Sequence, residues 1–586
     1  MRILIIFADM KRIFYCFAAA AAILTAAVTA SAKEHTLHVV TTGDVHGSWF
    51  DRSYVDDYRP YSLMNVNWYV DSLRNAVGEE NVLLLDAGDC LQGNNASYYY
   101  NYVATDTEHL FPRLVDYMGY DAIIVGNHDI ETGHPVYDKV NAELADRGIP
   151  WLAGNAVRTD GGEPYFPVYA MFERAGLDVA VLGFTNANMK AWLGEELWEG
   201  MDFLSLLPYV QECVDEVQAG EKPDVTIVVV HSGTGEGDGA MLESQGLDLL
   251  GTLEGVDLLV TSHDHRPAVV KSENGGAVML NGGSHARRVG HAVIDVDKKG
   301  RKLGAKEVSA EVVNLDWRKS DPAMQKAFDK EYQAVREFTN RPIGKLAVEL
   351  RSRDAYAGMS DYINLVHTVQ ISVPEADISF AAPLSFDGRV EPGTVIYNDV
   401  FTIYPYENEL YVMKLKGSEI KSYLEYSYDG WIQTPGEHVL KMTDEPDPRT
   451  GAARWSFTGR SYNFDSAAGL VYTVDVSKPY GQRIEIVSLA DGGEFDLNGW
   501  YNVAMTSYRA SGGGDLIFKG AGVSRDELES RIVGRYPAIR DMVSEFISSH
   551  GTIDSGTVSD PEILGEWHFL PEDADRMIAE DLKLIF

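Results

Sequence analysis

The sequence predicts a two-domain protein in which an α/β domain precedes a mixed α and β domain. Two observations lead to this prediction. Residues 36–297 alternate short apolar runs with helical stretches, a pattern typical of sheets buried under helices. Beyond a charged segment, residues 344–545 mix helical segments with β-rich runs. The length of 586 residues agrees, because it exceeds that of one ordinary domain.

Residues 1–32 have the features of a secretion signal. A basic MKR start is followed by an apolar run and by a small-residue cleavage site, Ala30-Ser31-Ala32. The alternative is an uncleaved membrane anchor, which the cleavage site disfavours. Cys16 lacks the small preceding residues of a lipoprotein signal. We therefore expect a periplasmic or secreted protein that is not stably inserted in a membrane after cleavage.

The composition is strongly acidic. The chain carries 88 acidic and 50 basic residues, a formal net charge of -38. This surplus argues against broad electrostatic binding to nucleic acid or to anionic lipid. An anionic substrate would need a bound cation to supply local attraction. Three cysteines, one of them in the signal segment, are too few for a disulfide framework.

The first domain, residues 33–317, contains seven apolar runs that we expect to be strands. They cover 36–42, 81–87, 121–126, 179–184, 225–231, 256–262 and 277–282. Three amphipathic stretches between the first runs are expected to be helices, at 67–77, 108–118 and 136–147.

A helical linker, residues 318–343, is predicted from the periodic charged segment that precedes Pro342. In the second domain, 344–545, we expect helices and strands to be mixed. The expected helices are 363–370 and 417–427, and the expected strands are 409–415, 470–476 and 501–507. The C-terminal extension, residues 546–586, is expected to lie on the surface and to pack through Trp567 and Phe569. The sequence does not fix an oligomeric state.

Polar side chains follow five apolar runs of the first domain, at the point where each run ends. They are Asp44 and His46 after 36–42, Asp89 after 81–87, Asn127 and His128 after 121–126, His231 at the end of 225–231, and His263 and His265 after 256–262. In open α/β sheets, ligands gather beyond the carboxyl ends of the strands. Each fragment alone is a weak signal, and an ordinary polar turn would explain it. Together they predict a metal site, because imidazole and carboxylate are ligands that divalent metals prefer.

The seven predicted ligands are enough for two ions if Asp89 bridges them. One ion would then be held by Asp44, His46, Asp89 and His265, and the other by Asp89, Asn127, His231 and His263. Two cations roughly 4 Å apart can bind a phosphoryl oxygen, lower the pKa of a water molecule and stabilise charge in the transition state. We expect zinc or manganese, although iron and cobalt also fit these ligands.

The motifs GDVHG, GDCLQG, GNHD and SHDH, with the isolated His231, resemble those of the calcineurin-like metallophosphoesterases. The second half resembles the 5'-nucleotidase C-terminal domain. The resemblance implies a four-layer αββα first domain and a mixed α+β second domain. It also implies that His128 stabilises the transition state or protonates the leaving oxygen. The family orients this histidine with an acid in the pattern G-N-H-E-x-D; here Asp129 replaces the Glu and Glu131 replaces the Asp, so Glu131 is the expected partner.

The resemblance also implies where a nucleoside would bind. In the family, two aromatic rings from the segments SYNFDSAAGLVYTVD and SYRASGGGD sandwich the base. Tyr462 and Phe464 alternate and would share one face of a strand. Tyr508 precedes a glycine loop, and Asp515 after that loop is a candidate contact to the base edge or the ribose. The alternative for Tyr462 and Phe464 is a role in the core.

One segment departs from the typical family pattern. Where 5'-nucleotidases have an N-G-G-x-R run that contacts ribose and phosphate, this chain has Ala381, Ala382 and Pro383, and Arg389 is the candidate to compensate. The variant looks closer to the 2',3'-cyclic-nucleotide 2'-phosphodiesterase/3'-nucleotidase branch. The resemblance therefore implies a two-metal hydrolase that removes phosphate from extracellular nucleotides. The alternatives are a nucleotide-sugar pyrophosphatase, a broad phosphatase and a nucleotide-binding protein without activity.

Several other polar residues have no partner spacing and are expected to be structural. They are His134, His285 and His291, together with Asp264, which should face away from the metals, and Cys90, which should be a small buried side chain.

Overall fold

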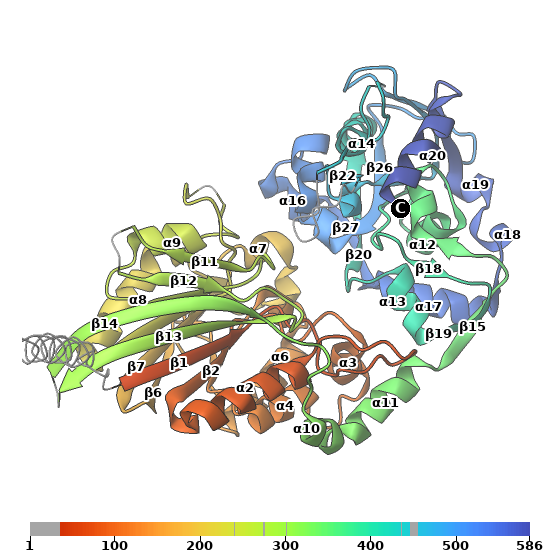
Figure 1. The fold of residues 1–586 in the computed structure, drawn as a ribbon. Helices are drawn as coiled ribbons and strands as arrows, with labels where there is room; N and C mark the ends of the chain where they lie inside the picture. Colours follow the sequence, from red (N-terminus) through yellow and green to blue (C-terminus); the bar gives the residue numbers. More distant parts are fainter. Residues whose placement is uncertain (1–34, 240, 274–275, 300–301, 435, 446–454) are drawn as a thin grey trace, which may run out of the picture.

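The computed structural model describes residues 35–239, 241–273, 276–299, 302–434, 436–445 and 455–586 (Figure 1). The predicted signal segment, residues 1–32, lies outside these ranges. Within them, none of the helices combines the length and the apolar character needed to span a membrane.

The first domain is built on two six-stranded sheets that lie face to face. The first sheet has the order β14-β13-β1-β2-β3-β4, with β1 His35–Thr42, β2 Val82–Asp86, β3 Ala122–Ile124, β4 Trp151–Leu152, β13 Arg288–Lys299 and β14 Lys302–Asn314. The second has the order β11-β12-β10-β9-β7-β6, with β6 Tyr169–Arg174, β7 Leu177–Phe184, β9 Val225–Val230, β10 Leu258–Thr261, β11 Ala268–Lys271 and β12 Val278–Asn281. A separate short pair consists of β5 Ala156–Arg158 and β8 Met201–Phe203.

Alternation along the strands explains why the domain has four layers. In β9, Ile227 and Val229 join the core between the two sheets. Val228 and Val230 join a second core under the helices α8 (Leu206–Gly220) and α9 (Gly246–Thr252). Successive side chains of a strand point to opposite faces, so a strand that is apolar throughout needs cover on both sides. The other sheet is covered in the same way by the helices α2 (Leu63–Val77), α4 (Leu110–Met118) and α6 (His134–Ala145). The predicted αββα arrangement is thereby confirmed (Figure 1).

The helices of this domain are short to medium in length. They are α2 Leu63–Val77, α3 Asn95–Tyr98, α4 Leu110–Met118, α5 Asn127–Ile130, α6 His134–Ala145, α7 Met189–Trp192, α8 Leu206–Gly220 and α9 Gly246–Thr252.

Parallel pairing places the functional ends of the strands together. In the first sheet β1, β2, β3 and β4 pair in parallel, and in the second β7, β9, β10 and β12 do the same. The carboxyl ends of each parallel set therefore meet at one edge of the sheet, where side chains from several loops can converge.

The predicted linker contains two helices, α10 Pro322–Ala327 and α11 Asp329–Thr339. Tyr332 of α11 packs into the core of the first domain. Phe338, the penultimate residue of α11, packs between Tyr98 of the first domain and Tyr397 of the second, with ring centroids 6.2 Å and 4.5 Å away. The linker thus contacts both domains.

The second domain is organised around a five-stranded sheet with the order β23-β17-β26-β20-β27. Its strands are β17 Ile378–Ala381, β20 Glu409–Lys416, β23 Ser466–Ala468, β26 Trp500–Thr506 and β27 Ile532–Ala538. Along β20, Leu410 and Val412 face one core and Tyr411 and Met413 face the other. Both faces of this sheet are therefore buried, which agrees with the predicted mixed α+β class.

Smaller sheets and helices complete the second domain. The strands are β15 Pro342–Leu346, β16 Leu350–Arg351, β18 Arg389–Val390, β19 Gly393–Ile396, β21 Met442–Thr443, β22 Ser456–Phe457, β24 Leu470–Asp475, β25 Ile484–Leu489, β28 Thr552–Ile553 and β29 Gly565–Leu570. The helices are α12 Asp361–Ile371, α13 Tyr397–Ile403, α14 Gly417–Trp431, α15 Ser507–Ala510, α16 Leu528–Arg531, α17 Ile539–His550, α18 Ser555–Val558, α19 Pro561–Leu564 and α20 Ala574–Ile585.

The C-terminal residues differ from the predicted surface extension. The helix α17 runs through the expected boundary at residue 545, and β29 pairs in parallel with β24. Trp567 and Phe569 are buried, as their apolar alternation predicts, and join the core of the second domain. Asp581 of α20 accepts hydrogen bonds from the backbone N–H groups of Val439 and Leu440 at 2.8 and 2.9 Å. The tail is therefore an integral part of this domain.

This role of the tail predicts a large effect of Phe569→Ala. The side chain is 2% exposed, and truncation should lower the free energy of unfolding of the second domain by about 3–5 kcal/mol, measured by denaturant titration. Leu584→Ala, in the same tail but 46% exposed, should change it by less than about 0.5 kcal/mol. If both substitutions changed the free energy of unfolding by the same small amount, the tail would be a surface extension and not part of the domain.

Candidate metal centre

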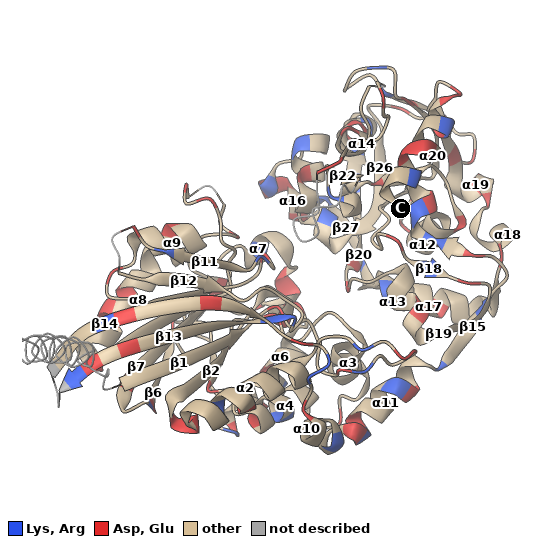
Figure 2. Cartoon of the chain, in the orientation of Figure 1, with Lys and Arg blue, Asp and Glu red and all other residues tan. Residues whose placement is uncertain are grey.

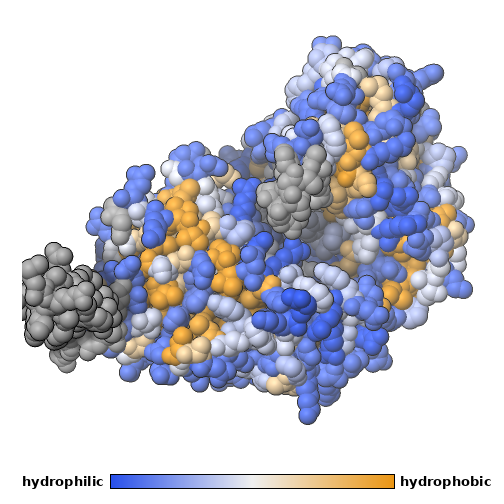
Figure 3. Space-filling model, in the orientation of Figure 1, coloured by the Kyte–Doolittle hydropathy of each residue, from blue (hydrophilic) through white to orange (hydrophobic). Residues whose placement is uncertain are grey.

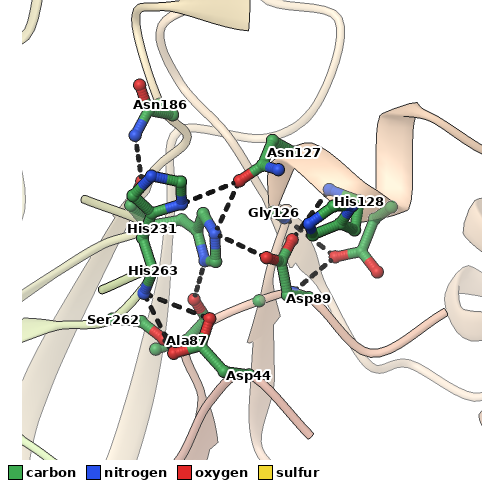
Figure 4. Close-up of polar contacts among 12 residues, drawn as sticks. Asp44, Ala87, Asp89, Gly126, Asn127, His128, Asn186, His231, Ser262 and His263 are labelled. Atoms are coloured by element: carbon green, nitrogen blue, oxygen red, sulfur yellow. Dashed lines mark hydrogen bonds and ion pairs between the residues drawn. The ribbon is translucent and has the colours of Figure 1, made fainter. Parts of the chain in front are cut away.

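The predicted ligands gather at the carboxyl ends of the parallel strands of both sheets (Figure 4). Two groups of three His or Asp residues each place their ligand atoms within 4.8 Å of one another. One group is Asp44, His46 and His265, and the other is Asp89, His231 and His263.

Asn127 joins the second group. The side-chain Oδ1 of Asn127 lies 3.1 Å from Nε2 of His231 and 3.0 Å from Nδ1 of His263. In His231, Nδ1 donates to the carbonyl oxygen of Ala87 at 2.7 Å, so Nε2 of the neutral ring carries a lone pair. This lone pair faces the carboxylate of Asp89, whose Oδ2 is 3.1 Å away. Four electron-pair donors therefore converge on one point, and a divalent cation fits there.

Electrostatics favours positive charge at this point. His231 is fully buried, and burial alone would lower its pKa. The Asp89 carboxylate more than offsets that cost and raises the pKa of His231 to about 9. A cation bound between His231 and Asp89 would balance the negative charge of the carboxylate in place of this proton.

The first group has a similar construction. His46 directs Nδ1 toward the carbonyl oxygen of Gln92 at 3.1 Å, which turns Nε2 toward Nε2 of His265 at 3.0 Å. Asp44 Oδ1 lies 3.6 Å from the same nitrogen of His265. Burial holds the pKa of His46 well below its usual value, so the ring is neutral and can act as a ligand. Burial likewise raises the pKa of Asp44 to about 7.

The backbone of the ligand loops is strained. Five of the seven predicted ligands have a left-handed backbone with φ between 48° and 78°, namely Asp44, His46, Asp89, His263 and His265. Such conformations cost residues with a Cβ atom about 1 kcal/mol or more and cluster at functional sites. The backbone N–H of Asp44 donates to the carbonyl of Gly88, and that of His46 donates to the carbonyl of Asp89. These two hydrogen bonds tie the loop of Asp44 and His46 to the loop of Asp89.

His128 lies beside this centre, on the short helix α5. Its Nδ1 is 2.5 Å from Oε2 of Glu131, one helical turn away, so the structure places Glu131 where the sequence predicts the partner of His128. Burial opposes a charge on His128, but Asp89 and Glu131 raise its pKa to about 10. The side chain remains 32% exposed and lines a cavity.

Asp129 has a role that the sequence analysis missed. Its carboxylate accepts hydrogen bonds from the backbone N–H groups of Gly126, Asp89, Cys90 and Leu91, at 2.8 to 3.0 Å. It therefore ties the loop that carries Asp89 to the loop that carries Asn127. The signal in the sequence was the acidic residue directly after Asn127 and His128. In the sequence analysis Asp129 was considered only as a departure from the pattern G-N-H-E-x-D.

A cavity of about 550 Å³ opens between the metal centre and the second domain (Figure 3). Asn127, His128 and His263 line it from the first domain, and Tyr462 and Tyr508 line it from the second. The cavity brings two of the predicted metal ligands and two of the predicted aromatic contacts to one space.

Two of the predicted nucleoside contacts are placed elsewhere. Phe464 is 1% exposed and stacks on Trp431, with ring centroids 5.6 Å apart, so it belongs to the core. The predicted strand, on which Tyr462 and Phe464 would share one face, is wrong. Residues 461–463 form a short 3-10 turn instead, so the two side chains point in different directions. Asp515 does not line the cavity, and its carboxylate pairs with Lys519 at 2.8 Å.

Arg509 is a second residue that the sequence analysis did not single out. It is 3% exposed and forms an ion pair with Asp465, with Nε 2.9 Å from Oδ2. The same guanidinium donates to the carbonyl oxygen of Tyr462 at 2.5 Å. Since Tyr508 is its chain neighbour, Arg509 holds the two tyrosine segments together.

The remaining predicted residues occupy structural positions, with one exception. Arg389 is exposed, pairs with Glu349 and Glu391, and does not line the cavity, whereas Ala381 and Ala382 do. Asp264 accepts from the backbone of Thr234, away from the ligands. Cys90 is a buried free thiol. His134 pairs with Asp138, and His291 lies 3.0 Å from His38.

The exception is His285, whose ring lies beside the first ligand group. Its centroid is 5.3 Å from that of His46 and 5.6 Å from that of His265. The only sequence signal was its position just after the strand β12.

Comparison with known proteins gives two family matches. Residues 37–267 match the calcineurin-like phosphoesterase family, and residues 342–520 match the 5'-nucleotidase C-terminal domain. The chain is 24% identical to a 2',3'-cyclic-nucleotide 2'-phosphodiesterase/3'-nucleotidase of Salmonella typhimurium, over 84% of this chain and 84% of that protein. It is 23% identical to a trifunctional nucleotide phosphoesterase of Bacillus subtilis, over 83% of this chain but only 36% of the length of that protein.

A solved structure from Staphylococcus aureus has the same fold. It superposes with a TM-score of 0.74 at 19% sequence identity and covers 91% of this chain and 99% of its own. The likeness therefore extends over both domains.

The position of Asp129 predicts that Asp129→Ala weakens the whole centre. Four buried N–H groups would lose their acceptor, so the free energy of unfolding of the first domain should fall by about 3 kcal/mol or more. Metal affinity, measured by titration calorimetry, should fall together with it, because the Asp89 loop is released. Asp160→Ala, an exposed loop carboxylate of the same domain, serves as the control. An Asp129→Ala variant with wild-type stability and metal affinity would show that this carboxylate does not organise the loops.

Proposed function

Because the chain combines a calcineurin-like phosphoesterase domain with a 5'-nucleotidase C-terminal domain, we propose that it hydrolyses phosphate esters of nucleotides. The activity is that of a 5'-nucleotidase or of a 2',3'-cyclic-nucleotide 2'-phosphodiesterase/3'-nucleotidase. The observation that carries this proposal is the shared cavity, in which Asn127 and His128 face the same space as Tyr462 and Tyr508.

The proposed cofactors are two divalent metal ions, with zinc or manganese as the candidates. Calcineurin-like phosphoesterases use a dinuclear centre, and the geometry of both ligand groups fits one. Asp44, His46, Asp89 and His265 would hold one ion, and Asp89, Asn127, His231 and His263 the other. When bound, such ions polarise phosphoryl oxygens and lower the pKa of an attacking water molecule.

His128 is the proposed catalytic residue. Glu131 occupies its Nδ1, so Nε2 is the nitrogen left to donate a proton. From the cavity wall it would hydrogen-bond to the phosphoryl group as negative charge develops, or would protonate the leaving oxygen. Glu131 is a positioning residue, since it fixes the orientation of the imidazole ring and its charge.

Tyr462 and Tyr508 are the proposed contacts to the nucleoside. Both are half-buried and line the cavity, and Arg509 fixes the segments that carry them. Stacking of a base on an aromatic ring contributes about 1–3 kcal/mol by analogy with nucleic-acid binders and tolerates different bases. This contact supplies a preference for nucleotides over simple phosphate esters.

The proposed location is the periplasm or the exterior of the cell. The signal-like residues 1–32 support this location, and so does the acidic composition. The proposed physiological role is the release of phosphate and nucleosides from extracellular nucleotides.

A substrate comparison tests the proposal. Metal-loaded protein should hydrolyse at least one of 5'-AMP, 3'-AMP and 2',3'-cyclic AMP with a higher kcat/KM than a simple aryl phosphate. Asn127→Ala should lower kcat by about 100-fold or more, because it removes a ligand at the centre. Preference for UDP-glucose would instead identify a nucleotide-sugar pyrophosphatase. Binding of nucleotides without any turnover, with metals bound, would refute the enzymatic proposal.

Tyr508→Ala separates a nucleotidase from a broad phosphatase in the same assay. Loss of one stacking contact should raise KM for the nucleotide by about 5- to 150-fold, the equivalent of 1–3 kcal/mol. Hydrolysis of the aryl phosphate should change little, since that substrate has no base to stack. Equal effects on both substrates would favour a broad phosphatase.

A further inference from the structure

The part of the cavity wall that comes from the second domain is acidic. Glu407, Glu409 and Asp541 line it, and Glu131 of the first domain faces the same space. Over the whole chain, Asp and Glu outnumber Lys and Arg by 88 to 50, and Figure 2 shows how these residues are distributed over the two domains. The metal centre and the adjacent His128 would thus be the main sources of positive charge for an anionic substrate.

Among the described residues that line the cavity, Arg509 is the only basic residue of the Lys and Arg type. Its positive charge is already paired with a carboxylate. Its Nε and Nη2 donate to the two carboxylate oxygens of Asp465, each at 2.9 Å. Its Nη1 donates to the side chain of Asn463 and to the carbonyl of Gly513. A substrate phosphate would therefore find no free guanidinium here.

Arg540, next to Asp541 in the chain, is also paired with a carboxylate. It is 1% exposed, and its Nη2 is 2.6 Å from Oε1 of Glu407. Asp541, by contrast, has a neutral partner, since the hydroxyl of Tyr98 donates to its Oδ1 at 2.5 Å. Glu409 and Asp541 both line the cavity, and neither is the ion-pair partner of Arg509 or of Arg540.

We propose that this acidic wall restricts the enzyme to nucleotides that carry a single phosphate, and that Glu409 and Asp541 are specificity-determining residues. The inference rests on the proposed function. Two metal ions held at this centre would neutralise only the phosphoryl group that they bind. A second phosphate on the same nucleoside would lie in the cavity without a cation and against carboxylates, and like charges at such sites repel a wrong ligand.

The direct test uses adenosine 3',5'-bisphosphate beside 3'-AMP and 5'-AMP. The bisphosphate contains the scissile group of both monophosphates, so the comparison does not depend on which phosphate is removed. At pH 8, metal-loaded protein should show a kcat/KM for the bisphosphate about 10-fold or more below that for the better monophosphate. Raising the ionic strength should narrow this ratio, because screening weakens the repulsion.

Two conservative variants and one control assign the effect to the wall. Glu409→Gln and Asp541→Asn remove the charge but keep the size of the side chain and its capacity for hydrogen bonds. Each should reduce the ratio of kcat/KM for the better monophosphate to kcat/KM for the bisphosphate by about threefold or more. Glu391→Gln removes one carboxylate charge at a side chain that is 62% exposed and outside the cavity, and should leave the ratio unchanged. A ratio near one in the wild type, or a ratio that neither wall variant alters, would overturn the inference.

Titration calorimetry separates this inference from the proposed function. Dissociation constants of the monophosphates and the bisphosphate, measured on metal-loaded protein, require no turnover. The inference is supported, even if no nucleotide is hydrolysed, when the bisphosphate binds more weakly than the monophosphates and Glu409→Gln reduces this difference in affinity. Equal affinities refute it even if hydrolysis of AMP is fast.

Discussion

The convergence of electron-pair donors around Asp89 is the constraint on which the rest of the structure depends. His231 presents a lone pair to the Asp89 carboxylate at 3.1 Å, and the Asn127 oxygen lies at the same distance from that nitrogen. Groups that all accept hydrogen bonds repel one another unless a cation lies between them. A centre of this kind must be imposed by the scaffold, and it is most stable when metal is bound.

The scaffold imposes it through strands, strained loops and one carboxylate. Parallel strands from both sheets end at the same edge, and their loops hold five ligands in left-handed backbone conformations. Asp129 ties two of these loops by accepting four backbone hydrogen bonds. The second domain then closes one side of the centre and adds aromatic rings and carboxylates, so the same cavity couples metal chemistry to the choice of substrate.

The fold of the first domain, and the loops on which the candidate ligands gather, were predictable from the sequence for a physical reason. Buried parallel strands are apolar throughout, so the sudden change to Asp, Asn or His at each strand end is visible in a single sequence. Glu131 lies beside His128 because i,i+3 residues of a helix are neighbours, a local relation that needs no tertiary information. Motifs that are local in the chain were therefore the most predictable part.

Features that depend on distant contacts were not predictable. The alternation of Tyr462 and Phe464 suggested a strand, but a short turn rotates Phe464 into the core against Trp431. The tail looked peripheral because its pairing partner, β24, is 95 residues earlier in the chain. His285 had no spacing to mark it, and only the fold brings it beside His46. The acidic cavity wall likewise comes from elements of two domains.

Anomalous X-ray diffraction from crystals grown with manganese or zinc tests the central claim most directly, because it locates metal without reference to activity. We expect two peaks roughly 4 Å apart at the ends of the two sheets, one beside Asp44, His46 and His265 and one beside Asn127, His231 and His263, with Asp89 between them. No peak at this position in metal-loaded crystals, or peaks bound by other residues, would contradict the account.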